Sequence, residues 1–339
     1  MTLPIDRFAP ITLPELLAEA ELLTRFDRKY LLDLQQAEAL LREFDPGTRV
    51  LEIDGRRCFR YESVYFDTPD LLSYRQAAHA RRHRFKVRTR SYLDSGLAFL
   101  EVKVRGDREV TVKDRIGYDL GARDQLTDSG RDYAEGTLDQ LGMDGSVAEQ
   151  LHPTLATRYG RITLLPPEPG VRVTIDTELT WSAIGAPEPA DDPSRLRASP
   201  EPQGSSRSRR PVAEARPGEP VEPSSAEARV ADGVQRSSYG GAGRQLWQPG
   251  RLHDETRTYD GGDDMEGSLA LPDMVIVETK SGPRPSSIDR LLWRNGHRPL
   301  SISKYGTGLA ALRGELPSNK WARILRHHFH TTEELSCAA

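Results

Sequence analysis

The sequence predicts an α+β fold in which an antiparallel β-barrel closes on itself and carries helices on its outside. Three observations support this prediction. Several segments alternate polar and apolar residues, as strands do. The polar positions carry charge in one segment after another, and helical patterns separate some of these segments. The clearest example is residues 84–92, RFKVRTRSY, where every second residue is a cation. For this strand alone, a solvated edge would be a sufficient explanation.

The N-terminal part of the chain predicts a helix, a strand and a second helix. Residues 12–15, TLPE, form a capping box with proline in the first turn, and leucines and alanines follow at helical spacing. Residues 25–32 then alternate with period two, so they predict a strand. Asp33 can cap the next helix, which ends before the Asp-Pro-Gly sequence at 45–47.

Strands dominate the following segment. Residues 58–67, CFRYESVYFD, are rich in aromatic and β-branched residues, and Thr-Pro-Asp marks the turn that ends them. Residues 71–80 are expected to be helical or irregular. Two further strands are predicted at 98–105 and 109–116, joined by a hairpin turn at Gly-Asp.

The second half of the chain is expected to contain an insert. Residues 119–150 have a helical, acidic pattern, and strands are predicted at 162–165 and 171–181. From 182 to 267 proline, glycine, serine, arginine and glutamate replace the aliphatic periodicity, which indicates a disordered insert. A single strand returns at 274–280, so we expect one domain formed by 1–181 and 268–315, followed by a helix and tail at 316–339.

Composition excludes several classes of protein. The formal net charge of −4 argues against a general nucleic-acid coat, so an anion site must be a local concentration of charge. Cys58 and Cys337 lie too far apart to suggest a zinc site or a disulfide framework. The chain has neither a signal-peptide pattern nor the roughly 20 apolar residues of a membrane span, so we expect a cytoplasmic protein.

One polar face of the predicted strands collects many cations with carboxylates between them. These residues are Lys29, Lys86, Arg88, Arg90, Lys103, Lys113 and Lys280, with Asp27, Glu101 and Glu278 among them. An open sheet would explain them as a solvated charged face. In a closed barrel they would instead line a wet tunnel, which is tolerable if the tunnel holds a polyanion and a divalent cation. A chain of phosphates fits better than nucleic acid, because aromatic residues do not interleave with the cations as a stacking platform.

The sequence resembles the catalytic domain of the vacuolar transporter chaperone (VTC) polyphosphate polymerases, a branch of the CYTH-like triphosphate tunnel metalloenzymes. The motifs that carry the resemblance are RFDRKY, YFDT, RFKVRTRSY, FLEVKVRG, TVKDR, the pair YGR and RVTID, VIVETKS and SISKY. They span 25–181 and 273–306. The resemblance implies a triphosphate tunnel barrel in which a nucleoside triphosphate and polyphosphate lie end to end, with one divalent metal, Mn²⁺ or Mg²⁺.

The resemblance also implies roles for individual residues. The expected phosphate ligands are Lys29, Arg88, Arg90, Lys103, Arg161, Arg172, Lys280 and Lys304, with Ser303 as a hydroxyl donor and Lys86 and Lys113 as further cations. Glu278 matches the metal-binding glutamate, and Glu101 would orient Lys103 or assist the metal. Hydrolytic relatives carry Glu-x-Glu-x-Lys where this chain has RFDRK at 25–29. Loss of the first carboxylate favours transfer to phosphate over attack by water.

The expected function is therefore a polyphosphate polymerase that transfers the γ-phosphoryl group of ATP to a growing polyphosphate chain. Two alternatives stay open. One is a tunnel triphosphatase that hydrolyses inorganic triphosphate or nucleoside triphosphates, and the other is a non-catalytic module that binds polyphosphate or inositol phosphates. The expected partners are ATP and inorganic polyphosphate, with no nucleic acid. Neither an SPX-type regulatory domain nor a membrane segment is expected.

Overall fold

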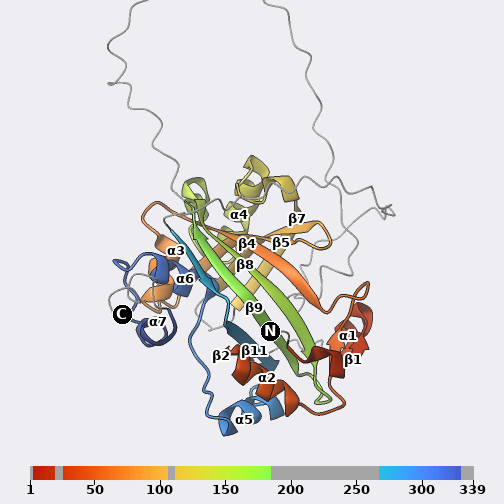
Figure 1. Ribbon diagram of the computed structural model, residues 1–339. Helices are drawn as coiled ribbons and strands as arrows, with labels where there is room; N and C mark the ends of the chain where they lie inside the picture. The colour runs from red at the N-terminus through yellow and green to blue at the C-terminus, as the bar shows by residue number, and fades with distance from the viewer. Residues whose placement is uncertain (1–2, 20–25, 106–110, 185–266, 330–339) are drawn as a thin grey trace, which may run out of the picture.

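The computed structural model describes residues 3–19, 26–105, 111–184 and 267–329 of the chain (Figure 1). The strands are β1 Ala9–Ile11, β2 Phe26–Asp33, β3 Arg49–Leu51, β4 Cys58–Asp67, β5 Arg84–Tyr92, β6 Leu97–Arg105, β7 Thr111–Tyr118, β8 His152–Leu165, β9 Arg172–Ala183, β10 Ser268–Leu271 and β11 Met274–Ser281. The α-helices are α1 Leu13–Glu19, α2 Leu34–Arg42, α3 Leu72–Ala78, α4 Asp128–Gln140, α5 Ser287–Arg294, α6 Lys304–Leu312 and α7 Ala322–His328. Short 3₁₀ helices cover Ile5–Arg7, Leu120–Ala122 and Gly145–Gln150.

The fold is α+β and is built on one large, mostly antiparallel sheet. Its main path runs β2-β11-β9-β8-β4-β5-β6-β7. Strand β10 pairs with β9, β3 pairs with β8, and β1 pairs in parallel with β3. Strands β4 to β7 each pair with the next strand along the chain, and α3 lies in the connection between β4 and β5. Strand β11, which is distant in the sequence, lies between β2 and β9.

The expected closed barrel is wrong for the described part of the chain, because no ladder of hydrogen bonds joins β2 to β7 there. The free edge of β2 has another partner: the backbone N–H of Leu300 donates to the carbonyl oxygen of Lys29 at 2.7 Å. The segment that leads into α6 thus lies against β2. The sheet still curves enough for Lys29 of β2 and Lys113 of β7 to line one pocket.

Helices cover the apolar side of the sheet in three places (Figure 1). Helices α2 and α5 pack on β2, β11 and β9, where Leu40 contributes to the same core as Val173 and Val277. Helices α3, α6 and α7 lie together on a second part of the sheet. Helix α4 covers β5 and β6, with Leu138 in the core beside Val102. Because side chains alternate along each strand, the polar residues between these core positions are left for the other face.

Local sequence signals explain several element boundaries. Asp33 is the N-cap of α2, as expected, and forms a capping box with Gln36; Ser286 and Asp289 form another at α5. Strand β8 is much longer than the strand expected at 162–165. It is buried on both faces along most of its length, so its sequence does not alternate. The short strands β1, β3 and β10 were not predicted.

The expected insert at 182–267 lies outside the described residues, apart from Ser182–Ile184 and Gly267. The expected hairpin turn after β6 and Arg25 of the first strand also lie outside them. Among the helices that are described, none is long and apolar enough to cross a membrane.

Candidate active site

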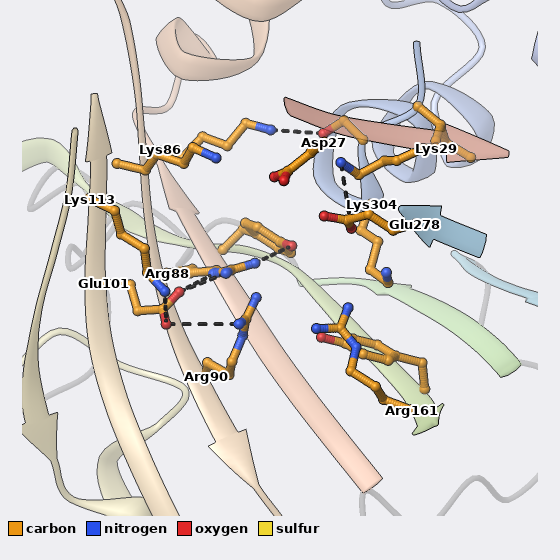
Figure 2. Close-up of a pocket in the computed structure, with 15 residues that line it drawn as sticks. Asp27, Lys29, Lys86, Arg88, Arg90, Glu101, Lys113, Arg161, Glu278 and Lys304 are labelled. Carbon is orange, nitrogen blue, oxygen red and sulfur yellow. Dashed lines mark hydrogen bonds and ion pairs between the residues drawn. The ribbon is translucent and has the colours of Figure 1, made fainter. Parts of the chain in front are cut away.

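A pocket lies on the polar face of the sheet, between the two ends of the strand path (Figure 2). Side chains of β2, β4, β5, β6, β7, β8 and β11 line it, together with the residues that lead into α6. The lining residues are Asp27, Lys29, Tyr65, Lys86, Arg88, Arg90, Glu101, Lys103, Lys113, Tyr159, Arg161, Glu278, Ile302, Ser303 and Lys304. Eight of these fifteen are lysine or arginine, a lining that suits an anionic ligand.

Glu101 holds three cations together on one wall of the pocket. Arg88 lies directly opposite it in the strand register, and the Nη2 atom of Arg88 is 2.6 Å from Oε2 of Glu101. The Nζ atom of Lys113 is 2.8 Å from Oε1 of the same carboxylate, and Nη1 of Arg90 is 3.9 Å away. Glu101 is almost fully buried. Its carboxylate therefore fixes the positions of the surrounding cations while leaving their outer N–H groups toward the cavity.

Glu278 and Asp27 organise the facing wall. Lys29 lies opposite Glu278 in the register, with its Nζ 3.5 Å from Oε2 of Glu278. Lys280 forms ion pairs with Glu278 and with Asp27, the latter at 3.7 Å. Burial alone would raise the pKa of Glu278, but the charges of Lys280, Lys29 and Arg161 hold it well below its usual range. The Glu278 side chain is therefore a carboxylate in the folded protein at neutral pH.

Asp176 supports the floor of the pocket. Arg161 and Asp176 are paired in the register of β8 and β9, and their side chains form two hydrogen bonds of 2.6 and 2.9 Å. Lys304 also forms an ion pair with Asp176, and its Nζ lies 4.3 Å from the centre of the Tyr159 ring. Burial opposes ionisation of Asp176, but Arg161 and Lys304 hold its pKa below the usual value.

Aromatic rings hold Arg161 of the floor and Arg88 of the Glu101 wall in place. The guanidinium carbon of Arg161 is 5.3 Å from the Tyr61 ring centre and 5.2 Å from that of Tyr159, and these two rings stack on each other. Arg88 donates a hydrogen bond of 3.2 Å to the hydroxyl of Tyr65. Cation–π contacts and stacking restrict both side chains to one orientation.

Lys86 and Ser303 connect β5 to the start of α6. The Nζ atom of Lys86 donates a hydrogen bond of 2.8 Å to Oγ of Ser303. Ser303 is the N-cap of α6, where its Oγ also accepts from the N–H of Gly306 at 3.1 Å. Burial and the charges of Lys103, Arg88, Lys29 and Lys320 hold the pKa of Lys86 well below the usual value.

The structure brings most of the predicted site residues into this one pocket and leaves two behind it. Arg172 and Lys280 are buried and do not line the pocket; they lie opposite each other in the register of β9 and β11. Asp176, Tyr65 and Tyr159 were not among the predicted site residues. Strand register could have indicated Asp176, but aromatic residues in strands are usually core, so nothing in the sequence distinguished the two tyrosines.

The carboxylates divide into two kinds as candidate metal ligands. Within the described residues, no cluster of three or more His, Cys, Asp or Glu side chains is suited to hold a metal alone. Glu278 and Asp27 both line the pocket and share Lys280. Mg²⁺ and similar ions are often bound by one or two carboxylates together with substrate phosphates. The donor set of Glu278 and Asp27 therefore fits a divalent cation that arrives with a phosphate ligand, while Glu101 pairs with Arg88 and Lys113 on the other wall.

Several solved structures resemble the fold only distantly. The HpAC1 protein of Hippeastrum, described as having a dominant triphosphatase activity, is 15% identical, with a TM-score of 0.30 over 46% of this chain and 73% of that one. A Bacillus halodurans protein described as a candidate adenylate cyclase is 14% identical, with a TM-score of 0.29 over 45% of this chain and 71% of that one. A Pyrococcus horikoshii protein is 15% identical, with a TM-score of 0.27 over 46% of this chain and 71% of that one. Likenesses this distant do not bear on function.

Family membership rests on the sequence match. No curated protein matches the chain. The VTC domain family model, in contrast, matches residues 24–313. This range includes all the lining residues of the pocket and all the strands of the sheet except β1. The chain therefore belongs to the VTC domain family.

Proposed function

We propose that the protein is a polyphosphate polymerase that transfers the γ-phosphoryl group of ATP to the end of an inorganic polyphosphate chain. The observation that carries this proposal is the presence of two cation groups on facing walls of one pocket (Figure 2). Arg88, Arg90 and Lys113 surround Glu101 on one wall, and Lys29 and Lys304 lie on the other. Two groups allow two anionic reactants to be held at once.

The chemistry assigned to these residues is positioning and charge neutralisation. A terminal oxygen of the chain attacks the γ-phosphorus of ATP, the bond from that phosphorus to the β–γ bridging oxygen breaks, and ADP leaves. Negative charge is spread over the transferred group, so fixed cations around it stabilise the transition state. Arg88 and Arg90 are suited to this role, because Glu101 already fixes their orientation before a ligand enters.

A divalent cation, Mn²⁺ or Mg²⁺, is part of the proposal. Glu278 and Asp27 would hold it, and when bound it would neutralise charge on the phosphate oxygens. Lys29 and Lys280 keep both carboxylates within the pocket wall. Glu101 is assigned to positioning Arg88, Arg90 and Lys113 instead. We place the activity in the cytoplasm, where ATP is supplied.

Transfer to phosphate is favoured over hydrolysis because the sequence RFDRK at 25–29 carries one fewer carboxylate than the Glu-x-Glu-x-Lys pattern. Only Asp27 precedes Lys29 on the face of β2 that lines the pocket. A hydrolase must fix and activate a water molecule, which a second carboxylate on this strand would serve. In this chain the position is occupied by arginine, which would bind a phosphate oxygen instead.

Incubation of the purified protein with ATP and Mn²⁺, followed by gel separation, tests the proposal. We expect ADP and a ladder of polyphosphate chains. Free phosphate without polymer would contradict the polymerase and identify a tunnel triphosphatase. Tight binding of polyphosphate that survives chelation and the Glu278→Ala substitution, with no turnover, would identify a binding module instead.

A further inference from the structure

Lysine is rare in this chain and is concentrated at the pocket. The sequence has seven lysines against 40 arginines. Lys29, Lys86, Lys103, Lys113 and Lys304 line the pocket, and Lys280 lies directly behind it against Glu278. Arginine keeps its charge at any accessible pH, whereas a lysine in unfavourable surroundings can release its proton. The pocket is therefore lined by five of the seven lysines of this chain.

Lys86 differs from the other pocket lysines whose partners are defined. Lys29 pairs with Glu278 at 3.5 Å, Lys113 pairs with Glu101 at 2.8 Å, and Lys304 pairs with Asp176. The amine of Lys86 contacts a hydroxyl instead, the Oγ of Ser303. Across the ranges that the structure describes, no carboxylate forms an ion pair with Lys86. Figure 2 shows its side chain extending from β5 across the top of the cavity.

The charged groups that act most strongly on Lys86 are all positive. They are Arg88 on the same strand, Lys103 opposite it on β6, Lys29 on β2 and Lys320 ahead of α7. The nearby carboxylates are already engaged: Glu101 by Arg88 and Lys113, Glu278 by Lys29 and Lys280, and Asp27 by Lys280. A half-buried ammonium group in this environment has neither full hydration nor a counterion, and both deficits favour the neutral amine.

We propose that Lys86 is uncharged while the pocket is free of ligand and takes up a proton when a phosphate chain enters, so that binding of the chain is coupled to proton uptake. The step is a simple protonation: the amine of Lys86 gains one proton from solvent and becomes an ammonium group. The neutral amine already donates one hydrogen to Ser303. The ammonium group gains a further donor and a full charge, both of which a phosphate oxygen can use.

This arrangement removes a cost that a permanent charge would carry. Eight lysine or arginine side chains line the pocket, and each added charge destabilises the free state by repulsion. A lysine that is charged only in the complex adds attraction for the ligand without adding repulsion to the free protein. The sign of the linkage follows: because the complex binds more protons than the free protein, affinity falls as pH rises, by up to about tenfold per pH unit for one proton.

Direct measurement on the free protein is the first test, and only seven lysines make it practical. Lysine labelled with ¹³C at Cε reports the protonation of each amine by NMR, and comparison with Lys86→Arg and Lys86→Gln assigns the Lys86 signal. We expect this signal to titrate below the ordinary lysine range, which is about 10.4, and to move upward when tripolyphosphate is added. Titration of Lys86 within the ordinary range in the free protein would overturn the proposal.

Calorimetry provides the second test. Tripolyphosphate binding is measured in buffers of different ionisation enthalpy, at a pH between the midpoints of Lys86 in the free and bound protein. Wild-type protein should take up close to one proton more than Lys86→Arg, whose charge is permanent. Lys113→Arg is the matched control, because Lys113 already has a carboxylate partner, and its uptake should equal the wild-type value. Equal uptake by Lys86→Arg and wild type would overturn the proposal.

The inference rests on the proposed function only for the chemical class of the ligand. Neither measurement requires turnover, so a protein that makes no polymer can still show the coupling. A protein that does make polymer, but whose Lys86 titrates normally, would retain the proposed function and lose this inference.

Discussion

Arg161 and Asp176 form a buried, two-point ion pair across β8 and β9, with hydrogen bonds of 2.6 and 2.9 Å, directly below the candidate phosphate site. Asp176 also accepts from Lys304. A single carboxylate therefore compensates two of the cations that line the pocket. Because Asp176 lies on β9, next to β8, the sides of Arg161 and Lys304 that do not contact it remain directed at the cavity.

Asp176→Asn should destabilise the protein strongly, because it leaves two cations without their counterion. Removing one partner of a buried pair typically costs about 3–5 kcal/mol, and we expect a loss in the free energy of unfolding of that order. Urea denaturation measures it. Asp94→Asn is the matched control, since Asp94 pairs with the exposed Arg56 and Arg60, and should cost less than about 1 kcal/mol. Equal losses for the two variants would contradict this role of Asp176.

Glu278 should make stability depend on pH in the acidic range. Despite its burial, the surrounding lysines hold its pKa well below the usual value, while its pKa in the unfolded chain is about 4.3. As the pH falls, the unfolded state therefore takes up a proton at Glu278 before the folded state does. The contribution is complete above the unfolded pKa and is lost as pH falls through the folded pKa.

Urea denaturation of the protein at pH values that decrease from about 6 in steps of about one unit measures how the free energy of unfolding depends on pH. Glu278→Gln should show a shallower fall in the free energy of unfolding than wild type. The substitution Glu149→Gln, at an exposed position, serves as the control. A Glu278→Gln protein that follows the wild-type pH dependence would show that Glu278 contributes nothing to it.

Tyr305→Phe should test how α6 is held against the pocket. The Tyr305 hydroxyl donates to the buried Asp67, which also accepts backbone N–H groups of Ser73 and Tyr74 at 2.8 and 2.9 Å. The Tyr305 ring stacks on Tyr65 with centres 5.0 Å apart. Loss of a hydroxyl that serves a buried carboxylate should cost about 1–3 kcal/mol.

The same substitution should also raise KM for ATP, because Tyr305 directly follows Ser303 and Lys304 at the start of α6. Tyr74→Phe is the matched control: its hydroxyl donates to the carbonyl oxygen of Pro317 at 3.1 Å, away from the pocket. An unchanged KM in Tyr305→Phe would show that α6 keeps its place without the Asp67 contact.

Arg88→Ala should lower kcat/KM for ATP by about 100-fold, as expected for loss of one fixed donor to the transferred group. Arg84→Ala is a matched control on the same strand, because Arg84 does not line the pocket and donates to the carbonyl oxygen of Arg81 at 2.7 Å. Steady-state ATP turnover measures both variants. A folded Arg88→Ala protein with full activity would remove Arg88 from the proposed mechanism.

Much of the candidate site could be predicted from the sequence, because the period of two in a strand is local. This alternation placed Lys86, Arg88 and Arg90 of β5 on one face, and all three line the pocket in the structure. The same reasoning did not work for β8, since burial on both faces removes the alternation. It also could not decide between a closed and an open sheet, because the edge of β2 is occupied by Leu300, which is far away in the sequence.

By itself, the sequence determined the fold class and which side chains share a face, since both depend on periodicities within a few residues. Only the tertiary structure decided which charge faces which. Arg161 has Asp176 beside it, Lys113 has Glu101, and Lys86 has a serine hydroxyl. Ser303 lies 217 residues from Lys86 along the chain. The protonation of a cation depends on its neighbours in space, so it is fixed only when distant strands and helices pack together.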